Sequence, residues 1–142
     1  MASLDWRQVW AHHPAPVRPC DESFANQCAI RMGVALRGAG VDLSGFDGAT
    51  CWFGHQPRHV LRAQELAEWL EAQAALVGPV DKKQHATSAD YAGRPGIVFI
   101  KDGWPSGGDH IDIWNGMALK GGQLDWFERG EIWFWDLSED DL

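Results

Sequence analysis

The stretch Asp109-His110-Ile111-Asp112-Ile113-Trp114-Asn115-Gly116 decides the fold, because it alternates polar and apolar residues and then ends in a turn dipeptide. Alternation of this kind predicts a strand with one apolar face, and Asn-Gly is a strong signal for a hairpin. Ile111 and Ile113 are therefore expected on one face of the strand. The other face is expected to carry the remaining side chains: His110, Asp112 and Trp114.

The segments on either side extend this sheet and place helices before it. Residues 96–101 and 131–135 are short apolar runs that predict two more strands. Upstream, helical periodicity predicts helices over about 4–11, from Ser23 or Asn26 to Arg37, and over about 60–75. Helices followed by an antiparallel sheet indicate an α+β fold. We expect one domain spanning residues 1–142.

Composition narrows the class of partner. The chain has 142 residues and a net charge of -8, from 20 acidic and 12 basic residues. Without a stripe of Lys and Arg to displace counterions, nucleic acid is not an expected partner. No segment has the length and apolarity of a membrane span. The first residues lack a secretory signal, so we expect synthesis in the cytoplasm and export by machinery that does not recognise signal peptides.

Cys28 and His110 are the candidates for chemistry. Cys28 falls in the first turn of the second predicted helix, where free N–H groups and the helix dipole favour a thiolate. The same N–H groups, with the side chains of Asn26 or Gln27, would stabilise an oxyanion. The alternative is that Cys28 is a small buried apolar residue. A cysteine at a helix start followed by a histidine on a strand is the arrangement of papain-like cysteine peptidases.

Three blocks of sequence carry a family resemblance. They are residues 24–32 around Cys28, residues 90–98, and residues 109–116 around His110, followed by a closing Trp-rich strand over 131–137. Together they resemble the type VI secretion amidase effectors of the fourth group, a branch of the NlpC-type papain-like cysteine peptidases. The resemblance implies a papain-like fold with N-terminal helices packed on a central antiparallel sheet.

The resemblance also implies an activity. It implies a peptidoglycan endopeptidase that cleaves the D-glutamyl to diaminopimelate amide of stem peptides, with Cys28 as nucleophile and His110 as base. It implies delivery by the secretion machinery, action in the periplasm of a rival bacterium and a cognate immunity protein. No cofactor and no metal are expected. The run 103–108 before the His110 strand is expected to be either a mobile lip of the groove, with Trp104 against substrate, or an ordinary loop.

The third catalytic residue is left open by the sequence. The family places an Asp eleven positions after the histidine, and Gly121 stands there in this chain. With a two-residue loop at Asn115-Gly116, His110 would lie opposite that position. The alternatives are Asp125 on a longer loop, Gln123, Asp112, a backbone carbonyl or water. We favour Asp125, because Asp112 is two residues along the strand and is expected to lie too far from His110 for a direct bond.

The remaining cysteines and two histidines offer other sites. Cys51, His55 and His59 with Cys20 have the side chains of a zinc site, but Pro57 prevents a single helix from presenting them together. The oxidising periplasm implied by the resemblance allows a Cys20–Cys51 disulfide. Two unpaired thiols are the alternative, and the sequence does not decide between them.

Two other functions compete with the amidase. Because Gly121 replaces the expected acid, the chain could be an inactive relative that binds wall fragments or a partner protein. It could also be a papain-like hydrolase of a different amide. Alkylation of Cys28 near neutral pH would distinguish an enzyme from an inactive relative. Mass analysis of digested peptidoglycan would distinguish the amidase from a hydrolase of a different amide.

Overall fold

The computed structural model describes residues 4–15, 28–43, 45–46, 48, 60, 62–103 and 108–138. Helices come first in the chain: α1 (Trp6–His12), α2 (Cys28–Gly38), α3 (Ala63–Glu71) and α4 (Ala74–Val77). Strands follow: β1 (Asp81–Lys83), β2 (Gly96–Lys101), β3 (His110–Trp114) and β4 (Glu131–Asp136). Two 3-10 helices, η1 (Ser88–Tyr91) and η2 (Leu124–Glu128), lie between strands. The predicted α+β order is confirmed.

The strands form one antiparallel sheet in the order β1-β4-β2-β3, so β3 is an edge strand. Ile100 of β2 pairs with His110 of β3 on one side and with Ile132 of β4 on the other. The sequence did not predict β1, because its residues Asp81, Lys82 and Lys83 are all exposed and have no apolar alternation.

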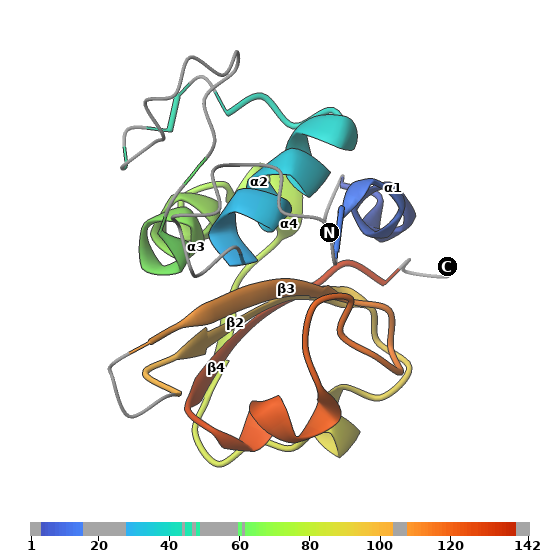
Figure 1. Ribbon diagram of the computed structural model, residues 1–142, viewed down its shortest axis with the longest axis vertical. Coiled ribbons are helices and arrows are strands. Elements are labelled where there is room, and N and C mark those ends of the chain that lie inside the picture. Colours follow the sequence, from blue (N-terminus) through green and yellow to red (C-terminus); the bar gives the residue numbers. More distant parts are fainter. Residues whose placement is uncertain are drawn as a thin grey trace.

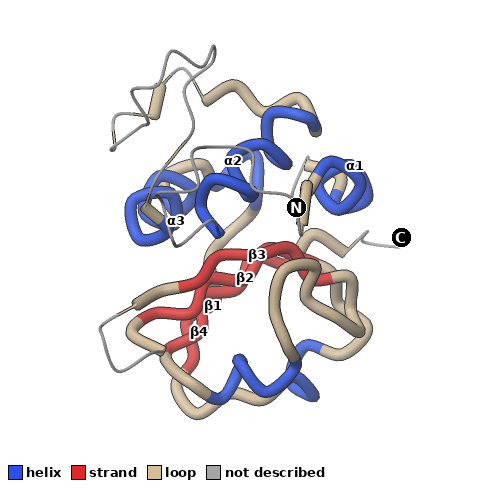
Figure 2. Tube along the Cα trace, in the orientation of Figure 1, coloured by secondary structure: helices blue, strands red, loops and turns tan. Residues whose placement is uncertain are grey.

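The sheet lies between the helices, above it in Figures 1 and 2, and the turns with 3-10 helices, below it. Each face packs into its own apolar layer. Ile111 and Ile113 belong to the layer shared with the helices, and Trp114 belongs to the layer beneath the sheet. The predicted alternation along β3 is therefore confirmed. Its upper face contributes to the main core, while its lower face carries His110 and Asp112, both of which are buried.

Two local predictions are wrong. The helix predicted over 60–75 is interrupted at Gln73, whose backbone leaves the helical region (φ -105, ψ 49), and Ala74 is exposed. The turn after β3 is longer than a two-residue hairpin. The N–H of Asn115 donates to the carbonyl of Ala118, and Trp114 bridges Leu119. Continuing this register, Gly121 lies beside Asp112 and not opposite His110.

Candidate active site

Cys28 and His110 meet where α2 reaches the β3 edge of the sheet. Cys28 is the first residue of α2 and is 6% exposed. Its thiol donates to the main-chain carbonyl of Asp109 over 3.8 Å, and its side chain also forms a hydrogen bond with His110. The sequence put these two residues on a helix start and a strand, and the fold brings them together.

Asp112 is the carboxylate that contacts His110. Its Oδ2 accepts a hydrogen bond from Nε2 of His110 over 2.8 Å, and the side chain is fully buried. The expectation that Asp112 lies too far for a direct bond is wrong. Side chains two residues apart share a face of a strand and can lean along it, and the imidazole is long enough to span the gap. Because Nε2 of His110 is bonded to Asp112, Nδ1 is the ring nitrogen that can exchange a proton with the Cys28 thiol.

Main-chain donors hold the Asp112 carboxylate. The N–H of Ile113 donates to Oδ1 over 2.8 Å, and the N–H of Gly121 donates to Oδ2 over 2.9 Å. A Cβ on Gly121 would lie 3.4 Å from Oδ2, an ordinary van der Waals distance from the carboxylate. Gly121 therefore supplies a main-chain donor to Asp112, at the position where the resemblance places an acid.

The residues after Gly121 do not supply a carboxylate to His110. Gln123 precedes η2 and Asp125 lies within it; both are exposed. Among the contacts between described residues, none joins Asp125 to His110, so the favoured expectation for Asp125 is replaced by Asp112. The neighbouring Trp126 does reach the site. Its ring packs edge to face on the imidazole of His110, with centroids 4.8 Å apart.

The charge state of His110 follows from these partners. Burial is the largest influence and by itself lowers the pKa of His110, because it disfavours the charged ring. The hydrogen bonds with Asp112 and Cys28 and the attraction of their charges act the other way and together outweigh burial, raising the pKa of His110 to about 9. The ring therefore holds a proton at neutral pH, as a thiolate–imidazolium pair requires.

A second histidine, which the sequence analysis missed, lies behind Asp112. His13 follows α1, is 4% exposed, and places Nε2 3.5 Å from Oδ1 of Asp112. Burial is the main cause that lowers the pKa of His13 to about 4, so this ring is neutral at pH 7. No local motif marks His13, because its partner lies on a strand near the other end of the sequence.

Comparison with known protein families identifies the family of this chain. Residues 24–135 match the family described as type VI secretion system (T6SS) amidase effector protein 4, Tae4. This chain belongs to the Tae4 family. Membership assigns it to the amidase effectors of type VI secretion, which are enzymes that act on amide bonds. No curated protein matches the sequence at a significant level.

Solved Tae4 structures share the fold over nearly the whole chain. Tae4 from Enterobacter cloacae is 22% identical with a TM-score of 0.73, covering 97% of this chain and 100% of its own. The Tae4-Tai4 effector-immunity complex from the same organism is also 22% identical, with a TM-score of 0.73 and coverage of 96% and 99%. The complex from Salmonella Typhimurium is 16% identical, with a TM-score of 0.72 and coverage of 95% and 99%. The predicted papain-like α+β fold is confirmed.

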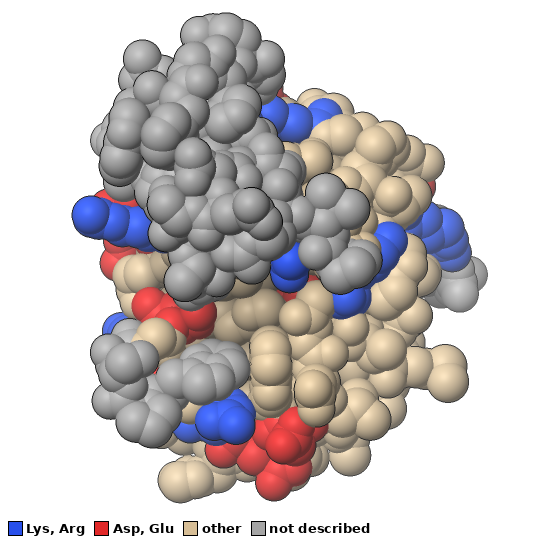
Figure 3. Space-filling view, in the orientation of Figure 1, with Lys and Arg blue, Asp and Glu red and all other residues tan. Residues whose placement is uncertain are grey.

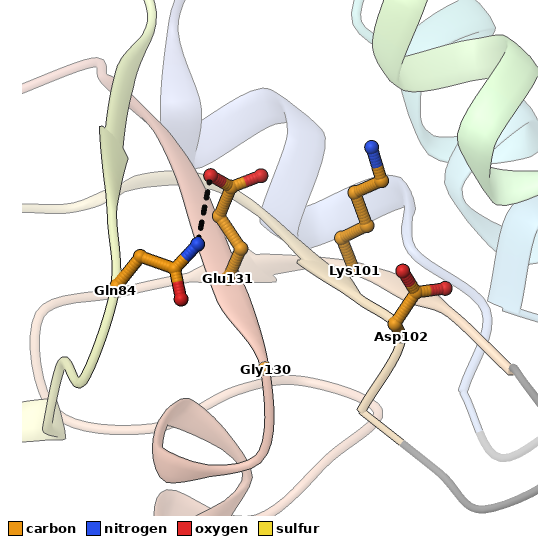
Figure 4. A pocket seen from close by; sticks show the side chains of 5 residues that line it. All are labelled: Gln84, Lys101, Asp102, Gly130 and Glu131. Carbon is orange, nitrogen blue, oxygen red and sulfur yellow. Dashed lines mark hydrogen bonds between the residues drawn. The ribbon is translucent and has the colours of Figure 1, made fainter.

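A hollow of about 370 Å³ lies at the His110 end of the sheet, lined by Gln84, Lys101, Asp102, Gly130 and Glu131 (Figure 4). Both carboxylate oxygens of Glu131 are engaged, one by Gln84 and one by the indole N–H of Trp133. The N–H of Asp102 donates to the side chain of Asp109, whose carbonyl accepts from Cys28. The hollow thus adjoins the segment that leads into the site.

Several predicted site residues lie outside the described residues: Asn26, Gln27, Trp104, Cys20, Cys51, His55 and His59. Within the ranges that the structure does describe, no three His, Cys, Asp or Glu side chains gather as a metal site. The helices in those ranges are all too short or too polar to cross a membrane. On the face in Figure 3, the described Lys and Arg side chains lie in several places, and the acidic side chains gather mainly at the left and at the bottom of the view.

Proposed function

We propose that this Tae4 family member is a cysteine endopeptidase that cleaves the D-glutamyl to diaminopimelate amide of peptidoglycan stem peptides. One observation carries the proposal. The Cys28 thiol contacts an imidazole that is itself bonded through Nε2 to the buried carboxylate of Asp112 over 2.8 Å. A nucleophile, a base and a group that orients the base are the minimum for thiol-based amide hydrolysis.

Acylation begins at the thiolate. The Cys28 sulfur attacks the amide carbonyl carbon, and the resulting oxyanion is placed at the start of α2. The first N–H groups of a helix have no partner within the helix and point toward such a charge. His110, protonated and with its pKa raised to about 9, then donates its proton to the departing amine. The C–N bond breaks and a thioester on Cys28 remains.

Deacylation returns the enzyme to its starting state. His110 is now neutral and accepts a proton from a water molecule that attacks the thioester. The carboxylic acid product leaves, and Cys28 and His110 are again a thiolate and an imidazolium. Throughout this cycle Asp112 keeps the ring orientation and stabilises its charged form. Asn26 and Gln27 as oxyanion partners and Trp104 as a wall of the groove remain part of the proposal.

Location and partners follow from the family. The proposed substrate lies in the periplasm of a target bacterium, which the effector reaches through the type VI secretion machinery. Related structures are titled Tae4-Tai4 effector-immunity complexes. By analogy we propose that this chain binds an immunity protein that blocks the Cys28 site. An immunity protein that binds the chain without inhibiting sacculus digestion would contradict this part.

The test is digestion of purified sacculi followed by mass analysis of the soluble fragments. The wild-type protein should release peptides with a new diaminopimelate amino terminus, and Cys28→Ala should release none while remaining folded. The matched control is His12→Gln, because His12 is exposed and, among the described residues, its ring forms a hydrogen bond with the main-chain carbonyl of Gln8 in α1. Undiminished digestion by Cys28→Ala would refute the mechanism. Fragments cut at another bond would refute the substrate assignment alone.

Iodoacetamide labelling distinguishes the enzyme from an inactive relative. A thiol paired with His110 should be alkylated near neutral pH, and His110→Ala should remove that reactivity. Peptide mapping identifies the modified residue among the three cysteines of the chain. The glycine at position 121 does not favour an inactive relative, because the carboxylate of Asp112 contacts His110 in place of an acid at position 121.

A further inference from the structure

The imidazole of His13 occupies a defined position behind the proposed catalytic residues. His13 directly follows α1, and its main-chain N–H donates to the carbonyl of Trp10. The side chain is almost completely buried, with 1% exposed, against the fully buried side chain of Asp112. A buried polar ring requires polar partners, and Asp112 is the partner on the side of Nε2.

The tautomer of His13 follows from its other nitrogen. The main-chain N–H of Ala15 lies 3.3 Å from Nδ1 and donates to it, so Nδ1 is an acceptor and carries no proton. In the neutral ring the proton is then on Nε2, which faces Oδ1 of Asp112 at 3.5 Å. This distance is longer than an optimal N–H···O bond, and Oδ1 is the carboxylate oxygen that His110 does not use.

Burial is the main cause that keeps His13 neutral, and the charged groups around it act in both directions. Asp112 from β3 attracts a proton to the ring, while Lys120 from the turn after β3, Arg31 from α2 and His110 repel one. Burial adds to the repulsion and is the largest influence, so the pKa of His13 is lowered to about 4. A neutral donor supports the Asp112 carboxylate without neutralising it, whereas a cation there would compete with His110 for the same charge.

The end of α1 contacts the turn after β3, close to Asp112. Nζ of Lys120 donates to the carbonyl of Trp10 and lies 5.1 Å from the centroid of its ring. Lys120 directly precedes Gly121, whose N–H donates to Asp112. Residues 24–135 match the Tae4 family, so α1 and His13 lie before the matched segment.

We propose that His13 is a positioning residue, a neutral imidazole delivered by α1 that holds the Asp112 carboxylate against His110. The proposal rests on the proposed function, because it assumes that His110 and Cys28 are the reacting pair. It makes α1 a part of the active-site apparatus and not only a helix packed on the core.

Three substitutions test separately the interactions of the two ring nitrogens of His13. The terminal amide of His13→Gln can place an N–H near the position of Nε2 and keep the donor to Asp112. The shorter His13→Asn can accept from Ala15, as Nδ1 does, but does not reach Asp112. His13→Leu removes both interactions and keeps the volume similar. The exposed neighbour His12, substituted as His12→Gln, is the matched control.

The primary readout is the rate of Cys28 alkylation by iodoacetamide as a function of pH, which does not depend on the substrate. We expect His13→Gln and His12→Gln to behave as wild type. In His13→Asn and His13→Leu, a poorly held carboxylate stabilises imidazolium less. The alkylation profile should therefore move upward by about one pH unit, equivalent to about tenfold in rate below the midpoint. On sacculi, kcat should fall about tenfold at unchanged KM.

The outcomes are distinguishable. If His110→Ala leaves the wild-type alkylation profile unchanged, the Cys28–His110 pair and the proposed function are refuted. If His110→Ala changes the profile while folded His13→Asn and His13→Leu match wild type, only the positioning role is overturned. A His13→Gln profile displaced as far as that of His13→Leu would also overturn it. If His13→Leu does not fold, the comparison of His13→Gln with His13→Asn decides.

Discussion

The end of α1 and the start of β3 each present an imidazole to the Asp112 carboxylate, and the two rings differ in charge. Burial is the largest influence on both and lowers both pKa values. For His110, the bonds with Asp112 and Cys28 outweigh burial and raise the pKa to about 9. For His13, the attraction of Asp112 does not outweigh burial, and the pKa of His13 falls to about 4.

The difference lies in distance and in the second partner. His110 approaches Asp112 at 2.8 Å and also bonds the Cys28 thiol, whereas His13 lies 3.5 Å away with Lys120 and Arg31 nearby. One buried carboxylate thus supports one charged ring. The ring beside the nucleophile is protonated, and the ring behind it is a neutral support. The predictions below either abolish this difference or measure it.

The largest effect is expected from removing the charged ring. His110→Ala should lower kcat on sacculi about 1000-fold, since general acid and base steps contribute on that order. His12→Ala, which removes an exposed imidazole from α1, should change kcat little. Initial rates of fragment release measure both. Activity of His110→Ala within tenfold of wild type would contradict the role of His110.

Asp112→Asn should lower kcat about 100-fold, because it removes the charge that stabilises the imidazolium. Asp112 is a cause that raises the pKa of His110, so the pKa should fall from about 9 and the alkaline limb of the activity profile should move to lower pH. The amide oxygen can still accept from Ile113 and Gly121, so the fold should persist. NMR titration of His110 measures the shift. An unchanged pKa would contradict the pairing.

These two residues also show what the sequence could and could not predict. The period of two along residues 109–114 correctly placed His110 and Asp112 on one face and Ile111 and Ile113 on the other. Helix periodicity placed Cys28 on the second helix. Both signals are local, because each depends only on which face of an element a side chain occupies.

The partner of His110 was mispredicted, because it depends on rotamers and on the length of one turn. The Asn115–Ala118 turn shifts Gly121 to Asp112, and the imidazole leans along β3 to reach the carboxylate. His13 had no signal at all, since its contact with Asp112 exists only after α1 packs on the sheet. Side-chain contacts between distant segments follow from tertiary packing and not from periodicity.

The two rings should give stability opposite slopes with pH. Below pH 6.5 the unfolded chain protonates His13 while the folded chain does not until about pH 4, so stability falls as the pH falls through that window. Above pH 6.5 the folded chain keeps the His110 proton until about pH 9 while the unfolded chain loses it, so stability falls as the pH rises. Each contribution is at most about 3 to 4 kcal/mol, because each pKa departs from 6.5 by about 2.5.

Urea unfolding across this range measures the slopes. His13→Gln should flatten the acidic side relative to wild type and leave the alkaline side unchanged. His110→Gln should do the reverse. Other carboxylates add to the acidic slope in every variant, so the comparison between variants is what carries the result. Parallel curves for wild type and His13→Gln below pH 6.5 would show that His13 is not buried as a neutral ring.

The smallest effect is expected at Asp125, and it distinguishes an exposed carboxylate from a buried one. Asp125→Asn makes the same chemical change as Asp112→Asn, but the side chain lies exposed in η2, and it is the adjacent Trp126 that contacts His110. We therefore expect kcat within about twofold of wild type and stability within about 0.5 kcal/mol, as for ordinary surface changes. Sacculus digestion and urea unfolding of the two Asn variants, measured side by side, provide the comparison. A loss of activity at Asp125→Asn that equals the loss at Asp112→Asn would move the catalytic carboxylate to η2, and the difference between the two imidazoles would then need another cause.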